Sequence, residues 1–227
     1  MTFSIAGYCA ETGQIGYALA TSSIAAGGRV AFAHWGVGVV LTQARTDPRL
    51  GPQGLALLRD GRSAAETVAS LVASTPERDW RQLAVLDKDG HGAFHTGQRV
   101  STPADALVAA HCVAAGNWVA EETVIAAMIA GFELDPFLPL AERLLRAIED
   151  AVAAGGELDP LRSAALGVHG RNGFAMVDLR IDRSERPVAD LRAAWKEWEP
   201  IMHGYIERAL SPATAPATEE LEGHAKG

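Results

Sequence analysis

The chain begins MTFSIAGYCAETGQIGYALATSS (residues 1–23), and this stretch decides the fold. Residues 2–9 and 14–22 are rich in strand-forming residues and flank the loop AETG, so they predict a β-hairpin with a glycine-containing turn. The first strand starts at Thr2, directly after a methionine that can be removed. Because chain ends are usually loose unless the fold holds them, a strand that starts at Thr2 predicts a defined position for this residue.

The rest of the chain alternates between groups of strands and pairs of helices. Further strands are expected in residues 30–44, joined near Trp35 and Gly36, in 81–97 around the turn Asp89-Gly90, in 110–114 before Gly116-Asn117, and in 162–182. Helices are expected at 52–61, at 63–74 with a capping box, at 121–132 and from 139 to about 155, and in a last segment that contains Leu191, Trp195 and Trp198.

This order predicts the fold class. Almost every strand pair is a hairpin, so the sheets should be antiparallel, and helices that come in pairs do not fit a doubly wound parallel sheet. We expect an α+β protein, a four-layer αββα sandwich of two antiparallel sheets with outer helix pairs, formed by residues 1–210 as a single domain. Residues 211–227 are rich in Pro, Ala, Thr and Glu and predict a disordered tail.

Composition limits the class of protein. The 227 residues are 48% hydrophobic, which is normal for a globular protein with a core. Their net charge of −8 argues against nucleic acid or an anionic membrane as a partner. We find no apolar run of membrane-spanning length and no secretory signal, and Cys9 and Cys112 do not make a disulfide framework. A cytoplasmic protein that acts on a small molecule or another protein fits best.

Thr2 is the first candidate for chemistry. Once Met1 is removed, Thr2 carries a free α-amino group, with an ordinary pKa of about 7.7–8.0, beside its own hydroxyl. A threonine activated by its own amine is an established type of nucleophile. The plain alternative is that many cytoplasmic proteins begin Met-Thr and are not catalytic.

Several motifs resemble one bacterial family. In order, they are the first 23 residues, GVGVVLTQARTDPRLGPQGLALL, RQLAVLD, HTG, AAGNWV, RSAALGV and VDLRIDRSERPVADLR. Together they resemble the family catalogued as domain of unknown function 1028, over about residues 2–195. That family is grouped by fold with the N-terminal-nucleophile (Ntn) hydrolases and has no settled activity.

The resemblance implies that Thr2 is the nucleophile. Asn117 is a candidate oxyanion donor or a simple turn or cap residue. Ser22 and Ser23 are candidates for bonding the terminal amine or only backbone groups. Gln43, at the end of an apolar strand, should be either well bonded in the interior or part of the site.

Other positions are weaker candidates or departures. Ser163 begins a core strand and either tunes the terminus or is structural. Proteasome-like relatives use an acid and a lysine beside the threonine, but neither follows the second strand here, so Arg29 and His34 are the nearest polar partners. No metal site is expected, because His91 and His95 would lie about 13 Å apart on one strand.

Three functions remain open. The first is an Ntn-type amidohydrolase that cleaves the C–N bond of a small polar amide without a cofactor. The second is a small-molecule-binding protein that keeps the fold without the chemistry. The third is an assembly role through the C-terminal helix and tail, and a homodimer is compatible with each of the three.

Overall fold

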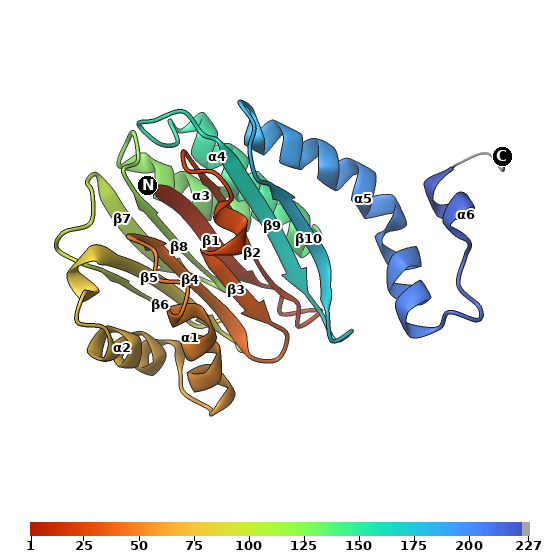
Figure 1. The fold of residues 1–227 in the computed structure, drawn as a ribbon, viewed down its shortest axis with the longest axis horizontal. Helices are drawn as coiled ribbons and strands as arrows, with labels where there is room; N and C mark the ends of the chain where they lie inside the picture. The colour runs from red at the N-terminus through yellow and green to blue at the C-terminus, as the bar shows by residue number, and fades with distance from the viewer. Residues whose placement is uncertain (224–227) are drawn as a thin grey trace.

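The structure is a computed structural model, and it describes residues 1–223. It contains two antiparallel sheets with helices outside them, as Figure 1 shows. The six-stranded sheet has the order β10-β9-β2-β1-β8-β7, and the four-stranded sheet has the order β3-β4-β5-β6. The strands are β1 (Thr2–Tyr8), β2 (Ile15–Thr21), β3 (Ala31–His34), β4 (Gly38–Ala44), β5 (Arg81–Asp87), β6 (Gly92–Thr96), β7 (Ala104–Ala109), β8 (Cys112–Asn117), β9 (Ser163–His169) and β10 (Ala175–Ile181).

The prediction of an α+β protein with two antiparallel sheets is confirmed. The strand predicted at 110–114 is found as β8, but it begins at Cys112 and ends at Asn117, because residues 110 and 111 form the turn between β7 and β8. His111 has a φ of 63° in this turn, which explains why the chain reverses there. No clear sequence signal predicts β7, because it is an edge strand in which only Ala106 is buried.

The helices are α1 (Leu50–Arg59), α2 (Ala64–Ser74), α3 (Thr123–Glu133), α4 (Leu140–Ala153), α5 (Pro187–Leu210) and α6 (Thr218–Glu222). The expected capping box forms at α2, where the Glu66 backbone N–H donates to Ser63 Oγ and the Ser63 N–H donates to the Glu66 carboxylate. Among the described residues, no helix is long and apolar enough to cross a membrane.

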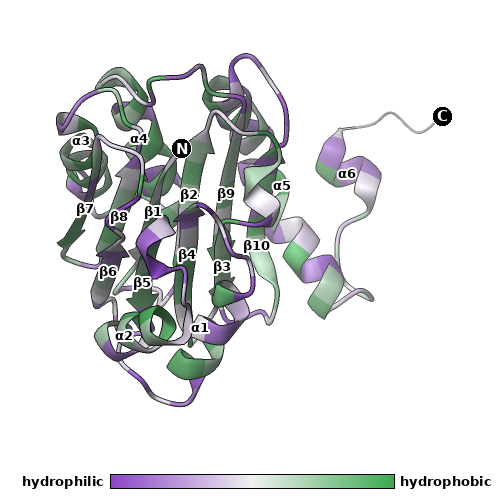
Figure 2. Cartoon of the chain, turned by 60° about the vertical axis from the view of Figure 1, so that its left-hand side comes forward, coloured by the Kyte–Doolittle hydropathy of each residue, from purple (hydrophilic) through white to green (hydrophobic). Residues whose placement is uncertain are grey.

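Three buried apolar clusters hold the layers together. One lies between the two sheets and includes Leu19, Leu41 and Leu86. A second packs α1 and α2 on the four-stranded sheet, and the third packs α3, α4 and α5 as far as Met202 on the six-stranded sheet. Figure 2 shows the same order, with strongly hydrophobic strands between helices that are polar outside.

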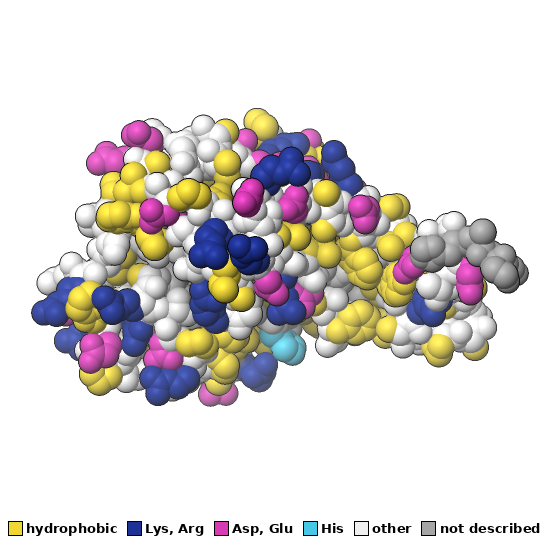
Figure 3. Space-filling model, turned by 45° about the horizontal axis from the view of Figure 1, so that its top comes forward, with side chains coloured by type: hydrophobic (Ala, Val, Ile, Leu, Met, Phe, Trp, Pro, Cys, Tyr) yellow, Lys and Arg dark blue, Asp and Glu magenta, His cyan; other side chains and the backbone are white. Residues whose placement is uncertain are grey.

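The chain ends differ in their surroundings. In Figure 1 the N-terminus lies at one end of the strands, while α5 runs outward and α6 lies apart from the layers. The space-filling view in Figure 3 shows a lobe that stands out from the main body. The tail predicted to be disordered therefore includes a short helix, whose Leu221 lies against Gly204 of α5. Disorder of residues 211–227 stays a prediction, and 224–227 lie outside the described residues.

Candidate active site at the N-terminus

Thr2 is held between two neighbouring strands at the start of β1, a central strand of the six-stranded sheet. In β1 it is paired with Asn117 of β8, while the next residue, Phe3, is paired with Ala20 of β2. Its side chain is buried beneath Met1, and only 5% of Thr2 is exposed. The start of β1 is therefore fixed on both sides, as the sequence predicted.

Two hydroxyl groups meet the peptide bond between Met1 and Thr2. Thr2 Oγ1 donates to the carbonyl oxygen of Met1, and Thr21 Oγ1 donates to the same oxygen at 2.6 Å. Thr21 Oγ1 in turn accepts the backbone N–H of Ser23 at 3.1 Å. The carbonyl next to the Thr2 hydroxyl thus already has a hydrogen-bond donor supplied by the neighbouring strand.

Two side-chain amides bond the backbone carbonyl of Thr2. Gln43 Nε2 and Asn117 Nδ2 both donate to the Thr2 carbonyl oxygen, at 3.3 and 3.4 Å. The same two amides donate to Gln82 Oε1, at 2.8 and 3.0 Å, and Ser4 Oγ donates to Gln43 Oε1 at 2.7 Å. Gln43 is thus both well bonded and beside Thr2, which combines the two alternatives that its sequence position left open.

The Asn117 amide group is already engaged by protein acceptors. Its Oδ1 is buried and has no hydrogen-bond partner among the described residues. An oxygen can only accept, so this free atom does not stabilise an oxyanion. Of the polar groups at the site, the Thr21 hydroxyl has the better geometry for that task.

A buried carboxylate lies beside the terminus. Glu157 Oε2 accepts the backbone N–H of Ser22 at 2.9 Å, while Oε1 has no partner within the described part of the chain. Burial raises the pKa of Glu157 above its ordinary value, although the bonds from Ser22 act in the opposite direction. Burial likewise lowers the pKa of the Met1 amine, which the charges of Glu157 and Asp159 raise in part.

The loop after β2 brings together four of the remaining candidates, Ser22, Ser23, Arg29 and Ser163. Ser163 Oγ donates to the Ser23 carbonyl at 2.7 Å and accepts the Ala26 N–H, so it braces the loop rather than the terminus. Arg29 Nη1 donates to the carbonyls of residues 24 and 25, at 2.7 Å each. Ser22 Oγ lies 3.9 Å from the Met1 sulfur.

His34 is not brought to this site. It is paired with Gly38 at the start of β4, whereas Gln43, near the other end of β4, is the residue that contacts Thr2. Five residues of strand separate those two positions, about 16 Å. His34 is exposed, and its Nδ1 is 2.8 Å from the Trp35 carbonyl oxygen.

A cavity of about 310 Å³ opens directly over Met1. The ends of β4 and β6 and the start of β5 form one wall, and the segments after β8 and α4 form the other. The lining residues are Met1, Ala44, Arg45, Trp80, Arg99, Val100, Ser101, Asn117, Trp118 and Asp159. Because Met1 is itself part of the lining, its removal would enlarge the cavity toward Thr2.

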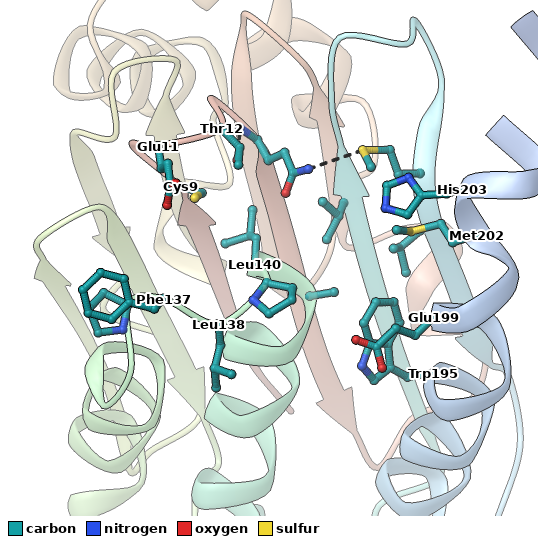
Figure 4. Close-up of a pocket in the computed structure, with 17 residues that line it drawn as sticks. Cys9, Glu11, Thr12, Phe137, Leu138, Leu140, Trp195, Glu199, Met202 and His203 are labelled. Atoms are coloured by element: carbon teal, nitrogen blue, oxygen red, sulfur yellow. Dashed lines mark hydrogen bonds between the residues drawn. The ribbon is translucent and has the colours of Figure 1, made fainter. Parts of the chain in front are cut away.

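A larger cavity, of about 440 Å³, lies elsewhere. Figure 4 shows its walls, which come from the β1–β2 turn, the segment before α4, and Trp195, Glu199, Met202 and His203 of α5. Cys9 lines it, at the opposite end of β1 from Thr2. Seven strand residues span about 23 Å, so this cavity is separate from the N-terminal site.

Sequence reasoning missed three residues of the N-terminal site. Thr21 could have been found from hairpin register, since Phe3 opposite Ala20 places residue 21 opposite residue 2. Gln82 is a lone amide in an otherwise apolar strand, the same signal that pointed to Gln43. Glu157 gave no local signal, because 135 residues separate it from the Ser22 that it contacts.

No metal centre is found at this site. In residues 1–223, no three or more His, Cys, Asp and Glu side chains are arranged so that they could hold a metal ion.

Comparisons with known proteins give a family and a close structural relative. A family model described as "Family of unknown function (DUF1028)" matches residues 2–191. The crystal structure of SPO2555 from Silicibacter pomeroyi, assigned to the same family model, is 32% identical, with a TM-score of 0.81 over 87% of this chain and 88% of that one. Anbu (ancestral beta-subunit) from Yersinia bercovieri is 13% identical, with a TM-score of 0.39 over 86% and 93% of the two chains. No curated protein matches.

Proposed function

Since the chain belongs to the DUF1028 family of unknown function, we propose a specific activity for it: an Ntn-type amidohydrolase with Thr2 as nucleophile. The layer order of helices, two antiparallel sheets and helices agrees with the αββα sandwich of Ntn hydrolases. Its substrate is an amide small enough for the cavity over Met1. Met1 must first be removed, because it covers Thr2.

One observation carries this proposal. The Thr2 hydroxyl lies against the carbonyl of the residue before it, and the Thr21 hydroxyl donates to the same oxygen at 2.6 Å. When Met1 is gone, the carbonyl of a bound amide can take up the vacated position. There it meets a nucleophile and a hydrogen-bond donor, the two groups that acyl transfer requires.

The chemistry then follows from the free terminus. Thr2 Oγ1 attacks the amide carbon, its proton passes to the Thr2 α-amine, and the Thr21 hydroxyl stabilises the oxyanion. The C–N bond breaks when the α-amine gives this proton to the leaving nitrogen, which leaves an ester on Thr2. Water attacks the ester, again with the α-amine as base, and Thr2 Oγ1 is released with its proton restored.

Glu157 and the amides have supporting roles in this scheme. Gln43 and Asn117 hold the Thr2 carbonyl, so the nucleophile keeps its position. In the chain that still carries Met1, burial lowers the pKa of the Met1 α-amine and the Glu157 charge raises it. We propose that the same two effects act on the Thr2 α-amine once Met1 is removed. The balance between these two effects sets the pH at which the base becomes available.

A binding protein without chemistry is the second candidate. It is favoured by Met1 itself, which covers Thr2 and lines the cavity, so a chain that keeps Met1 still has a pocket but no free nucleophile. The intact mass of the untagged protein separates the two. Loss of one methionine is required for the amidohydrolase, and retention of Met1 supports the binding protein.

Thr2→Ala tests the nucleophile. We expect turnover of amides, followed by mass spectrometry over a library, to fall at least 1,000-fold, because the attacking atom is removed while the cavity stays. Thr2→Ser should keep measurable turnover. Thr12→Ala, which alters an exposed threonine in the β1–β2 turn, is the matched control and should behave as wild type. Undiminished turnover by a well-folded Thr2→Ala protein would refute the mechanism.

A further inference from the structure

The wall of the N-terminal cavity formed by the four-stranded sheet is built around one tryptophan. Trp80 directly precedes β5, Arg45 directly follows β4, and Arg99 follows β6. Because neighbouring antiparallel strands end at a common edge, these three residues come together there. The Cζ atoms of Arg45 and Arg99 lie 4.4 and 5.3 Å from the centre of the Trp80 ring.

These two arginines have no acidic partner among residues 1–223. The nearby Asp47 is engaged by other arginines, with Arg49 at 2.8 Å and Arg81 at 3.9 Å. Arg45 and Arg99 are both exposed, and both line the cavity. Stacking on a ring uses the face of a guanidinium and leaves its N–H edge free to bind a planar anion.

The cavity wall that faces the arginines carries a negative charge, that of Asp159. Asp159 accepts the indole N–H of Trp118 at 3.0 Å, which holds its carboxylate on the side of the cavity away from the four-stranded sheet. An anionic group in the cavity is repelled by Asp159 and attracted by the arginines. The cavity is therefore polarised, although the protein as a whole carries a net charge of −8.

From this arrangement we infer that the site takes amides that also carry a carboxylate, and that Arg45 and Arg99 bind this carboxylate while the amide lies over Thr2. The inference rests on the proposed function for the identity of the reacting group. It adds the substrate class, an acidic amide, and two specificity residues at the edge of the four-stranded sheet.

The alternative is that both arginines only stack on Trp80. Such exposed cation–π contacts stabilise a fold by about 0.5–1 kcal/mol and need no ligand. This alternative predicts that replacing the arginines changes stability slightly and leaves ligand selectivity unchanged. A binding measurement that compares charged and neutral compounds of one shape distinguishes the two.

Succinamate and glutaramate, with their diamides as neutral counterparts, are suitable test compounds. Each pair differs only in whether one end is a carboxylate or an amide. Binding is measured by calorimetry on the full-length Thr2→Ala protein, which cannot turn them over. We expect at least one monoamide to bind ten or more times more tightly than its diamide, because charge-assisted hydrogen bonds are the strong ones.

Substitution of the arginines should remove this preference. In the double variant Arg45→Gln/Arg99→Gln, the ratio of monoamide affinity to diamide affinity should fall to within about twofold of one. Added salt should weaken the preference of the wild-type arginines for the monoamide. Arg59→Gln, which alters an exposed arginine at the end of α1, is the matched control and should leave the ratio unchanged. Arg45→Lys/Arg99→Lys should keep part of it, since charge remains but the planar fork is lost.

The outcomes separate this inference from the proposed function. Equal binding of monoamides and diamides, or a preference that survives in Arg45→Gln/Arg99→Gln, overturns the acidic-amide assignment even if the wild-type protein hydrolyses amides. A preference that depends on the arginines in a protein whose wild-type form never hydrolyses the compounds supports the anion site. That second result counts against the amidohydrolase and for the binding protein.

Discussion

At the scale of single residues, the N-terminal site contains buried polar atoms that have no hydrogen-bond partner among the described residues. Glu157 is 7% exposed and has one carboxylate oxygen without a partner among the described residues. A buried polar atom without a partner commonly costs about 1–3 kcal/mol. A protein tolerates such a cost most readily where the group serves a site, and the charge of Glu157 acts on the α-amine of Met1.

Glu157 should make stability depend on pH. Burial raises its pKa in the folded protein, so the folded state binds more protons than the unfolded state above the ordinary pKa of about 4.3. The free energy of unfolding should therefore fall as the pH rises from that value through the raised pKa, and then level off. Each unit between the two pKa values corresponds to about 1.4 kcal/mol.

Glu157→Gln should remove this dependence. Urea unfolding at a series of pH values between 4 and 8 should show the wild type losing stability relative to Glu157→Gln as the pH rises. Glu121→Gln, which alters an exposed carboxylate in the segment before α3, is the control and should track the wild type. A constant difference between the wild type and Glu157→Gln at every pH would show that the carboxylate keeps its ordinary pKa.

The sequence predicted residues of this site only where the signal was local. Thr2 was found because it directly follows a methionine that can be removed and begins a strand, and Gln43 because it stands at the end of an apolar strand, where a buried amide needs partners. Glu157 and the pairing of Gln43 with Gln82 depend on which strands and loops meet in space. His34 was included on sequence proximity alone, and its place at the end of β3, opposite Gly38, puts it at the far end of the strands from Gln43.

At the scale of elements, hairpin signals and helix caps predicted most of the fold. The β1–β2 and β5–β6 hairpins follow from their turn residues, and α2 follows from its capping box. The pairing of β4 with β5 could not be predicted in this way, because α1 and α2 intervene and no turn sets its register. The edge strand β7 has little apolar pattern to detect.

Gly51 shows how closely α1 approaches the four-stranded sheet. A Cβ at this position would lie 2.1 Å from Cδ2 of Phe32 on β3. Gly51→Ala should therefore destabilise the protein by about 1–3 kcal/mol, although alanine favours helices by about 1 kcal/mol over glycine. Denaturant unfolding measures the change.

Gly28→Ala is the matched control for Gly51→Ala. A Cβ at Gly28 meets nothing within 4 Å, so this substitution should leave the free energy of unfolding within about 0.5 kcal/mol of wild type. If Gly51→Ala is as stable as Gly28→Ala, α1 can move away from β3 at little cost, and the contact with Phe32 does not fix the position of this helix.

At the scale of the whole molecule, the buried contacts that stabilise the fold lie between the layers, and on α5 they extend only as far as Met202. The cluster that joins α5 to the six-stranded sheet includes Leu191 and Trp195, and Met202 is its last fully buried member. Beyond Leu210, α6 packs on α5, where Leu221 lies against Gly204 and the Tyr205 hydroxyl donates to the Glu222 carboxylate. Before α6, the Pro216 carbonyl accepts from Arg208 at 3.1 Å. The tail therefore adds contacts at the surface and none to the core.

Deletion of residues 212–227 should consequently change the thermal midpoint by no more than about 2 °C, since about 1 kcal/mol shifts a domain of this size by 2–4 °C. Trp195→Ala is the contrasting change, because it empties a buried site and removes the hydrogen bond to Glu142, and it should lower the midpoint by about 6 °C or more. Elution volume in size-exclusion chromatography tests the assembly role in the same samples. A deletion that lowers the midpoint as far as Trp195→Ala, or that halves the apparent mass, would show that the tail is part of the folded assembly, because only a buried contact can have so large an effect.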